Sequence, residues 1–148
     1  MVAGELEFQM QRLGINEADG PSFVNLIAAQ AERAKTLREL ADKSVYFYRD
    51  VEYNADAVKQ HLTKDATFPL AAVCEELQKL DDWNKESIHQ CVSSVSEKLG
   101  LKLGKIAQPL RVAVSGNTIS PPIDITLTLL GRDKTLQRIN AALAICQN

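Results

Sequence analysis

An arginine followed by a polar loop with two prolines is the part of this sequence best suited to recognising a ligand. Arg111 stands inside an apolar stretch, and residues 115–122 follow it with serine, asparagine and threonine side chains and two prolines. Prolines restrict the backbone of such a loop before a ligand binds, so little conformational entropy is lost on binding. Its polar side chains and the arginine can then hydrogen-bond the edges of an unstacked nucleic-acid base. The alternative is that Arg111 buries its stem and pairs with a carboxylate across the core.

Basic side chains near this loop are candidates for sequence-independent attraction to phosphates. They are Lys102, Lys105, Arg132, Lys134 and Arg138. The charge of the chain is uneven, because residues 1–97 carry 10 Lys/Arg against 17 Asp/Glu, whereas residues 98–148 carry 7 against 2, within a net charge of −2. A solvated basic face has the same composition, so charge alone does not separate the two interpretations.

No catalytic or metal-binding pattern accompanies these residues. The sequence matches neither GxxxxGK[ST] nor GxGxxG, and His61 and His89 lack partners at a spacing typical of a catalytic triad. Cys74, Cys91 and Cys146 form no CxxC pair, so we expect buried or idle thiols in a reducing cytosol. We therefore predict no catalytic residue, no metal site and no cofactor in this chain.

Length and composition fit an ordinary folded protein. The 148 residues are 45% hydrophobic and 24% charged, which suits one medium domain or two small ones. No apolar run approaches the roughly 18 residues that a membrane span needs. The acidic N-terminal stretch lacks the basic region and apolar core of a secretory signal. We expect a cytoplasmic protein without a membrane partner.

The elements that must position these residues are predicted to be helices almost throughout. Apolar residues recur at helical spacing in the segments 23–48 (with a break near Lys35–Thr36), 56–62, 70–80, 84–99, 122–130 and 133–146. Asn84 is a suitable N-cap for the fourth segment, and Gly100 is a suitable terminator for it. The sequence therefore predicts an all-α fold.

Residues 101–116 are the exception to the helical pattern. Pro109 lies within their apolar and basic run, so we expect a kink or break there, and Arg111–Val114 could form a strand. The helices are predicted to form a bundle of two packed subdomains, the first spanning residues 1–63 and the second residues 64–148.

Several stretches of the sequence also carry a family pattern. The longest is Gly100-LKLGKIAQPLRVAVSGNTISPPIDITLTLLG-Arg132, and Ala31-ERAKTLRELADKSVYFY-Arg49 and LDDWNKESIHQCV accompany it. Together they resemble the anticodon-binding C-terminal region of bacterial glutamyl-tRNA synthetases, which shows G-x-K-x-G-K-x-x-x-P-L-R-x-A-x-[TS]-G, then a serine/threonine–proline loop and a leucine-rich helix ending in glycine. The resemblance covers residues 13–143 and implies a helical cage of two subdomains.

The resemblance implies two arginines that read the anticodon. The arginine of the family's E-R-x-K-T-L segment corresponds to Arg33, and in the family it is associated with the third anticodon letter, a cytosine that separates glutamate tRNA from glutamine tRNA. The arginine of P-L-R corresponds to Arg111, which is associated with the first letter. Without the resemblance, Arg33 would be interpreted as a solvated charge on a helix face.

The resemblance also implies contacts from the loop after Arg111. The family's Thr-Pro corresponds to Ser120 and Pro121, and its apolar contact corresponds to Ile123. The next family position is often aromatic, but it is Asp124 here, which we expect to cap the helix that begins near Pro122. Base stacking at that position is therefore not expected.

The resemblance finally implies a larger context. The family joins glutamate to its tRNA with ATP and magnesium, using a catalytic domain with HIGH-like and KMSKS-like motifs that do not occur here. It implies a tRNA(Glu) partner, a catalytic domain upstream of Met1, a monomeric state and a direct role in translation. The alternatives are a helical protein-interaction module with no RNA role and a small stand-alone enzyme.

Overall fold

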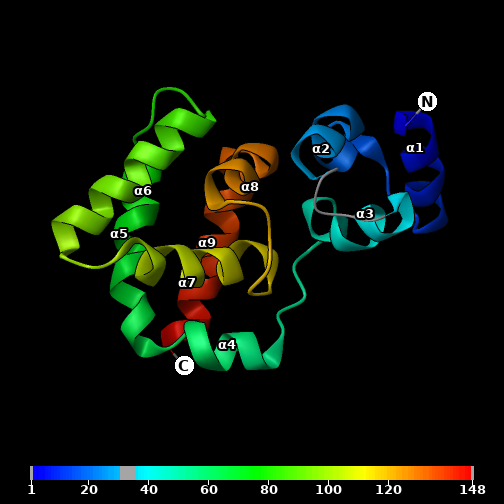
Figure 1. Cartoon of the computed structure of the whole chain (residues 1–148). Helices are drawn as coiled ribbons and strands as arrows, with labels where there is room; N and C mark the ends of the chain where they lie inside the picture. The colour runs from blue at the N-terminus through cyan, green and yellow to red at the C-terminus, as the bar shows by residue number, and fades with distance from the viewer. Residues whose placement is uncertain (1, 31–35, 148) are drawn as a thin grey trace. The chain divides into compact units, whose positions relative to one another are not determined.

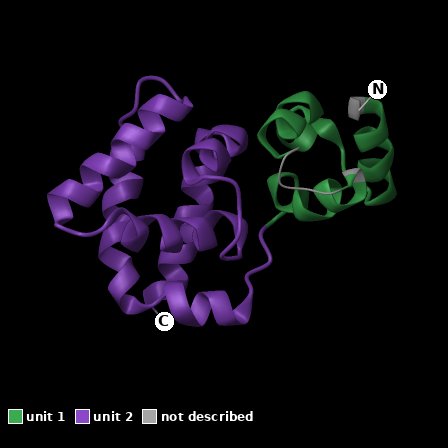
Figure 2. Ribbon diagram, viewed as in Figure 1, with its two compact units in different colours: residues 1–50 green, residues 51–148 purple. Residues whose placement is uncertain are grey.

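The computed structural model describes residues 2–30 and 36–147, and across these residues the chain is helical without a strand (Figure 1). The all-α prediction is confirmed. The chain divides into two compact units, Met1–Asp50 and Val51–Asn148, which we call unit 1 and unit 2 (Figure 2). The sequence predicted a division at residues 63/64 instead. The observed and predicted boundaries differ because the helix over residues 55–61 packs within unit 2.

Unit 1 is a small group of helices, α1 (Val2–Arg12), α2 (Phe23–Gln30) and α3 (Leu37–Lys43), with 3-10 turns at Glu17–Asp19 and Val45–Phe47. Helix α1 packs against both α2 and α3. The fully buried side chains of this unit include Leu6, Met10, Leu26, Leu40 and Phe47. Helix α3 begins at the predicted break, because the Thr36 hydroxyl accepts a hydrogen bond from the Glu39 amide at 3.0 Å.

Unit 2 contains the remaining helices, which pack around α5 and α7. They are α4 (Ala55–His61), α5 (Thr67–Gln78), α6 (Lys85–Leu99), α7 (Leu103–Ser115), α8 (Ile123–Leu130) and α9 (Arg132–Gln147), with a 3-10 turn at Lys64–Ala66. Helix α5 packs against α6 and α9, α6 packs against α8, and α7 packs against both α4 and α9 (Figure 1). None of the helices in the described part of the chain has the length and apolar character to cross a membrane.

Local capping residues set the ends of α6 as predicted. The Asn84 side chain accepts a hydrogen bond from the Ser87 amide at 2.8 Å, which satisfies a donor at the first turn. Gly100 ends the helix in the left-handed conformation, with φ +65°. Both predictions for this helix are confirmed.

Helix α7 runs through Pro109 without interruption, so the predicted strand over Arg111–Val114 is wrong and Pro109 does not break the helix. Proline removes one backbone hydrogen bond from a helix interior and crowds the preceding turn. Burial offsets that cost, because Ile106, Leu110 and Val112 are all completely buried. Each such side chain contributes about 1.5–3 kcal/mol when it leaves water.

The C-terminal end of α7 receives hydrogen bonds from distant parts of unit 2. The Tyr53 hydroxyl donates to the Ala113 carbonyl at 2.9 Å, and the Arg138 guanidinium on α9 donates to the Val114 carbonyl at 2.7 Å. These carbonyls lie in the last turn, where no helical amide can reach them. A cation at this end of a helix also interacts favourably with the helix dipole.

Gly116 follows α7 and lies directly against residues 51–54. Its φ of +79° is left-handed, and a Cβ placed there would meet Val51 Cγ1 at 2.7 Å and the Glu52 carbonyl oxygen even closer. The Asn54 amide donates to the Gly116 carbonyl at 2.8 Å. The loop after α7 therefore starts from a fixed backbone position that only glycine fits.

The three cysteines are buried, as the sequence predicts, and free. Burial raises the pKa of each thiol, and for Cys91 burial and the nearby Glu76 carboxylate raise the pKa from 9.0 to about 11. Desolvation disfavours the charged thiolate, which is the nucleophilic form. These thiols are therefore poorly reactive in the folded chain.

Substitution of Gly116 by alanine should destabilise unit 2 more than substitution of Gly100. Both residues have a positive φ, so each alanine carries a conformational cost of about 1–2 kcal/mol. Only Gly116 has backbone atoms in the way, whereas a Cβ on Gly100 meets nothing within 4 Å. Urea unfolding of the two variants measures the difference, and equal losses would contradict the close packing on residues 51–54.

The Cys91 thiol should make the fold sensitive to alkaline pH. Its pKa is raised in the folded chain, so the stability linked to the protonated thiol is complete below pH 9.0 and is lost as the pH rises towards about 11. Between pH 8 and pH 11, the unfolding free energy of the native chain should fall by on the order of 2 kcal/mol more than that of Cys91→Ser. An equal pH dependence in the two proteins would contradict this assignment.

Candidate nucleic-acid interface

Helix α7 and the loop that follows it bring Arg111 and Ser120 into contact. Arg111 is half-buried, and its Nε donates a hydrogen bond to Ser120 Oγ at 2.9 Å. Its Nη1 donates to the side-chain oxygen of Gln108, which lies three residues earlier on α7. The Ser120 hydroxyl and the Gln108 amide oxygen thus orient the plane of the guanidinium. Through the bond to Ser120, Arg111 is joined to the loop over residues 116–122.

Hydrogen bonds from buried hydroxyl groups hold the loop over residues 116–122. Ser120 is 9% exposed, and its hydroxyl also donates to the Pro121 carbonyl at 2.7 Å. Thr126 on α8 is completely buried, and its hydroxyl donates to the same carbonyl at 3.0 Å. Pro121 is buried as well. Ser120 therefore holds Arg111 and is itself held through the Pro121 carbonyl, while direct contact of Ser120 and Pro121 with a base stays a prediction.

Helix α8 starts beside this loop, with Ile123 as its half-buried first residue. The prediction that Asp124 caps the helix is wrong, because Pro122 occupies the N-cap and Asp124 is the second helical residue. The Asp124 carboxylate accepts a hydrogen bond from the Ile125 amide at 2.9 Å. A carboxylate in the first turn is still stabilised by the helix dipole.

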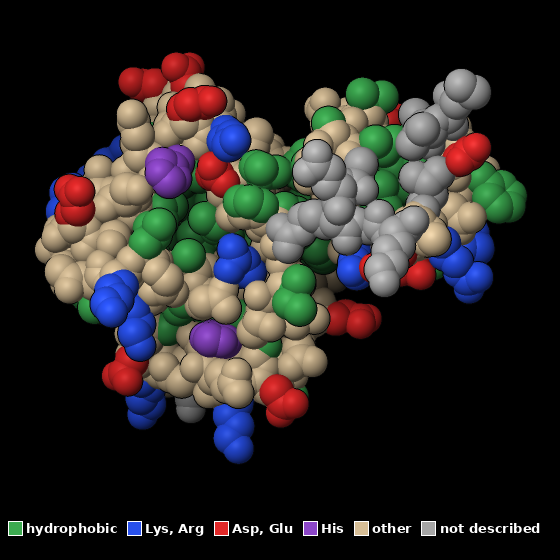
Figure 3. All heavy atoms as spheres, viewed as in Figure 1, with side chains coloured by type: hydrophobic (Ala, Val, Ile, Leu, Met, Phe, Trp, Pro, Cys, Tyr) green, Lys and Arg blue, Asp and Glu red, His purple; other side chains and the backbone are tan. Residues whose placement is uncertain are grey.

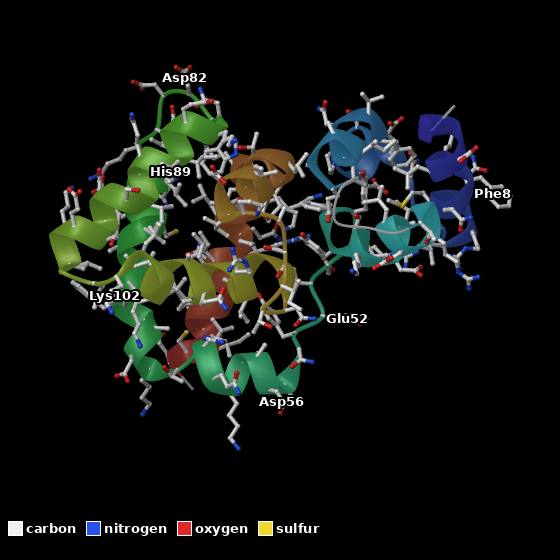
Figure 4. All side chains as sticks on the ribbon, in the orientation of Figure 1. Phe8, Glu52, Asp56, Asp82, His89 and Lys102 are labelled. Carbon is white, nitrogen blue, oxygen red and sulfur yellow. The ribbon has the colours of Figure 1, made fainter. Side chains whose placement is uncertain are left out.

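Two of the three lysines predicted to meet phosphates, Lys102 and Lys105, lie at the start of α7, and the third, Lys134, is a half-buried residue of α9. Lys102 is the N-cap residue, Lys105 lies in the first turn, and both are exposed. Figure 4 labels Lys102 at this end of the helix. On the face of unit 2 shown in Figure 3, basic side chains alternate with acidic ones. The surface there is mixed in charge, so phosphate contacts would depend on individual side chains.

The arginines on α9 have structural contacts. Arg132 is half-buried and lies 5.5 Å from the centre of the Trp83 ring, and it donates to the Leu80 carbonyl. It therefore holds the turn between α5 and α6, and its predicted phosphate contact stays a prediction. Arg138 is 7% exposed and serves the end of α7, so the prediction that it faces phosphates is wrong.

Arg33 lies outside the described residues, so its position relative to Arg111 is not part of the structure. Within residues 2–30 and 36–147, no group of three or more His, Cys, Asp or Glu side chains is arranged to hold a metal ion.

Sequence reasoning missed Gln108, Thr126 and Ile119. Gln108 precedes Arg111 by the three-residue spacing that pairs side chains on a helix, a signal hidden by the prediction of a break at Pro109. Thr126 is a polar residue on the apolar face of α8, where a buried hydroxyl needs a partner. Ile119 is an apolar residue inside a polar loop, and it is 73% exposed.

The chain matches a family model described as an anticodon binding domain over residues 5–143. It is 48% identical over 143 residues to a glutamate–tRNA ligase of Legionella pneumophila (strain Corby) and 49% identical over 143 residues to glutamate–tRNA ligase 1 of Alkalilimnicola ehrlichii. Each alignment covers 96% of this chain and 30% of the relative. The chain thus spans less than a third of the length of these curated relatives.

Solved structures share the fold. The structure of a glutamate tRNA ligase from Elizabethkingia meningosepticum in complex with its amino acid aligns with a TM-score of 0.85 at 20% identity, covering 97% of this chain and 28% of that chain. The glutamate-tRNA synthetase from Elizabethkingia anophelis aligns with a TM-score of 0.78 over the same shares. The helical arrangement of this chain therefore also occurs within longer proteins.

Proposed function

The chain belongs to the anticodon-binding domain family, and from this premise we propose that it recognises the anticodon loop of tRNA(Glu) as part of a glutamate–tRNA ligase. The observation that carries the proposal is the oriented guanidinium of Arg111 inside the matched region. Its Nε is hydrogen-bonded to Ser120 at 2.9 Å, beside a loop that is itself held by buried hydroxyls.

Arg111 recognises a base by presenting donors to acceptor atoms on the base edge. A guanidinium already held in one plane loses little entropy on binding, and a good bidentate contact with a base edge contributes about 1–3 kcal/mol of discrimination. The wrong base leaves a buried donor unpaired, which costs free energy of similar size. On the family pattern, Arg111 meets the first anticodon letter, and Ser120, Pro121 and Ile123 contact the anticodon from the loop that follows.

Arg33 reads the third anticodon letter, and an arginine at this position favours the cytosine of glutamate tRNA over the base found in glutamine tRNA. Lys102, Lys105 and Arg132 contribute phosphate contacts, which attract RNA without regard to sequence. The glutamylation itself, with its ATP and magnesium, belongs to a catalytic domain that lies outside this chain. We place the protein in the cytoplasm as a monomer that acts in translation.

The interaction-module alternative gains no support from the family match or from the relatives. Salt dependence separates the two functions experimentally. Binding that neutralises phosphates weakens as salt rises, whereas an apolar protein contact changes little.

Replacing Arg111 by alanine should weaken binding of the tRNA(Glu) anticodon stem-loop about tenfold, because one bidentate base contact is worth about 1–3 kcal/mol. Arg111→Lys keeps the charge but loses the planar donor fork, so it should also weaken binding. Fluorescence anisotropy with a labelled stem-loop measures both. Unchanged affinity in both variants, with the fold intact by circular dichroism, would show that Arg111 is not a base contact.

Replacing Arg33 by glutamine should reduce the preference for cytosine at the third anticodon position. The measured quantity is the ratio of affinities for stem-loops carrying cytosine or guanine there, which should fall by about fivefold or more on the scale of a lost base contact. Arg38→Gln is the matched control, because Arg38 is an exposed residue of α3 and its loss should leave the ratio unchanged. An equal ratio in native chain and Arg33→Gln would assign the discrimination elsewhere.

A further inference from the structure

We propose that Ile119 is a further recognition residue, whose side chain packs on the face of the same unstacked nucleotide whose edge meets Arg111. The inference rests on the proposed function and adds a contact to it. Ile119 is 73% exposed, the largest exposed fraction among the strongly exposed large hydrophobic side chains of the described residues.

The backbone turns Ile119 outward and Ser120 inward. The two residues follow each other in a segment without helical structure, and Ser120 is only 9% exposed. Ser120 Oγ lies 2.9 Å from Arg111 Nε, so the inward residue is fixed to the arginine that the proposed function places at the base edge. Ile119 is therefore one residue away from that arginine's anchor, with its side chain in solvent.

The loop that carries Ile119 is held at both ends. Before it, the Ser115 hydroxyl donates to the Arg111 carbonyl at 2.7 Å and accepts from the Asn117 amide at 3.2 Å. After it, two prolines restrict the backbone, and Thr126 binds the Pro121 carbonyl at 3.0 Å. A loop held at both ends loses little backbone entropy when a ligand contacts Ile119.

An unstacked base fits this site better than a protein surface. A base offers a flat apolar face and a polar edge, which are the two features that Ile119 and Arg111 complement. A protein partner would need a wider apolar patch. In the described part of unit 2, the other exposed large hydrophobic side chains are Phe68 on α5 and Leu101 and Leu103 at the opposite end of α7. Ile119 therefore stands apart from them.

The first test replaces Ile119 by serine and measures binding of the tRNA(Glu) anticodon stem-loop to the chain by fluorescence anisotropy. Loss of an apolar contact of this size should weaken binding about five- to tenfold. The thermal midpoint and the slope of affinity against salt should stay unchanged, because Ile119 is neither buried nor charged. Phe68→Ser is the matched control, since Phe68 is 68% exposed on α5 and its loss should leave binding unchanged.

The second test uses a stem-loop that is abasic at the first anticodon position. The native chain and Ile119→Ser should bind this stem-loop equally, because the base that Ile119 covers is missing. A loss of affinity that persists on the abasic stem-loop, or no loss on the intact one, would overturn the proposed contact while leaving the role of Arg111 standing. Failure of the native chain to bind the intact stem-loop would overturn the proposed function together with this inference.

Discussion

The carbonyl oxygens at the C-terminal end of α7 need donors, and much of unit 2 is arranged to supply them. Tyr53 and Arg138 bind the carbonyls of Ala113 and Val114, and the Asn54 amide binds the carbonyl of Gly116. These donors come from the segment before α4 and from α9, which are far apart in the sequence. A buried carbonyl without a donor costs about 1–3 kcal/mol, so this set of bonds fixes where α7 ends and where the following loop begins.

The need for donors at the end of α7 explains why Arg138 and Arg111, which both lie near the loop, have different roles. Arg138 is buried and donates a hydrogen bond to the α7 backbone, so its guanidinium stabilises the fold. Arg111 is half-buried, and side chains of the same helix and loop orient it. Composition alone counts both as basic residues near a polar loop. Only the tertiary position of α9 separates a structural cation from a candidate binding cation.

The features that the sequence could predict are those that depend on neighbouring residues. Asn84 and Gly100 act as caps within a few residues of their own position, so the ends of α6 follow from local chemistry. The continuity of α7 through Pro109 does not follow from local chemistry. It depends on tertiary packing, because the buried side chains of α7 lie in a unit where this helix packs on α4 and α9. The division between units also depends on tertiary contacts, since α4 packs on α7 in unit 2. For the candidate site, the spacing indicated Arg111 and its loop, while the family resemblance supplied their assignment to anticodon letters.

The way Arg111 is held bears on how it can discriminate. Its hydrogen bonds to the Ser120 hydroxyl and the Gln108 side-chain oxygen fix the plane of the guanidinium. Ser120 in turn is held through the Pro121 carbonyl, which Thr126 also binds from α8. A change in the position of α8 would therefore reach Arg111 through two hydroxyl groups. The strength of a hydrogen bond falls steeply when the donor is misaligned with the acceptor. Discrimination between base edges therefore depends on the buried residues that position the loop as well as on Arg111 itself.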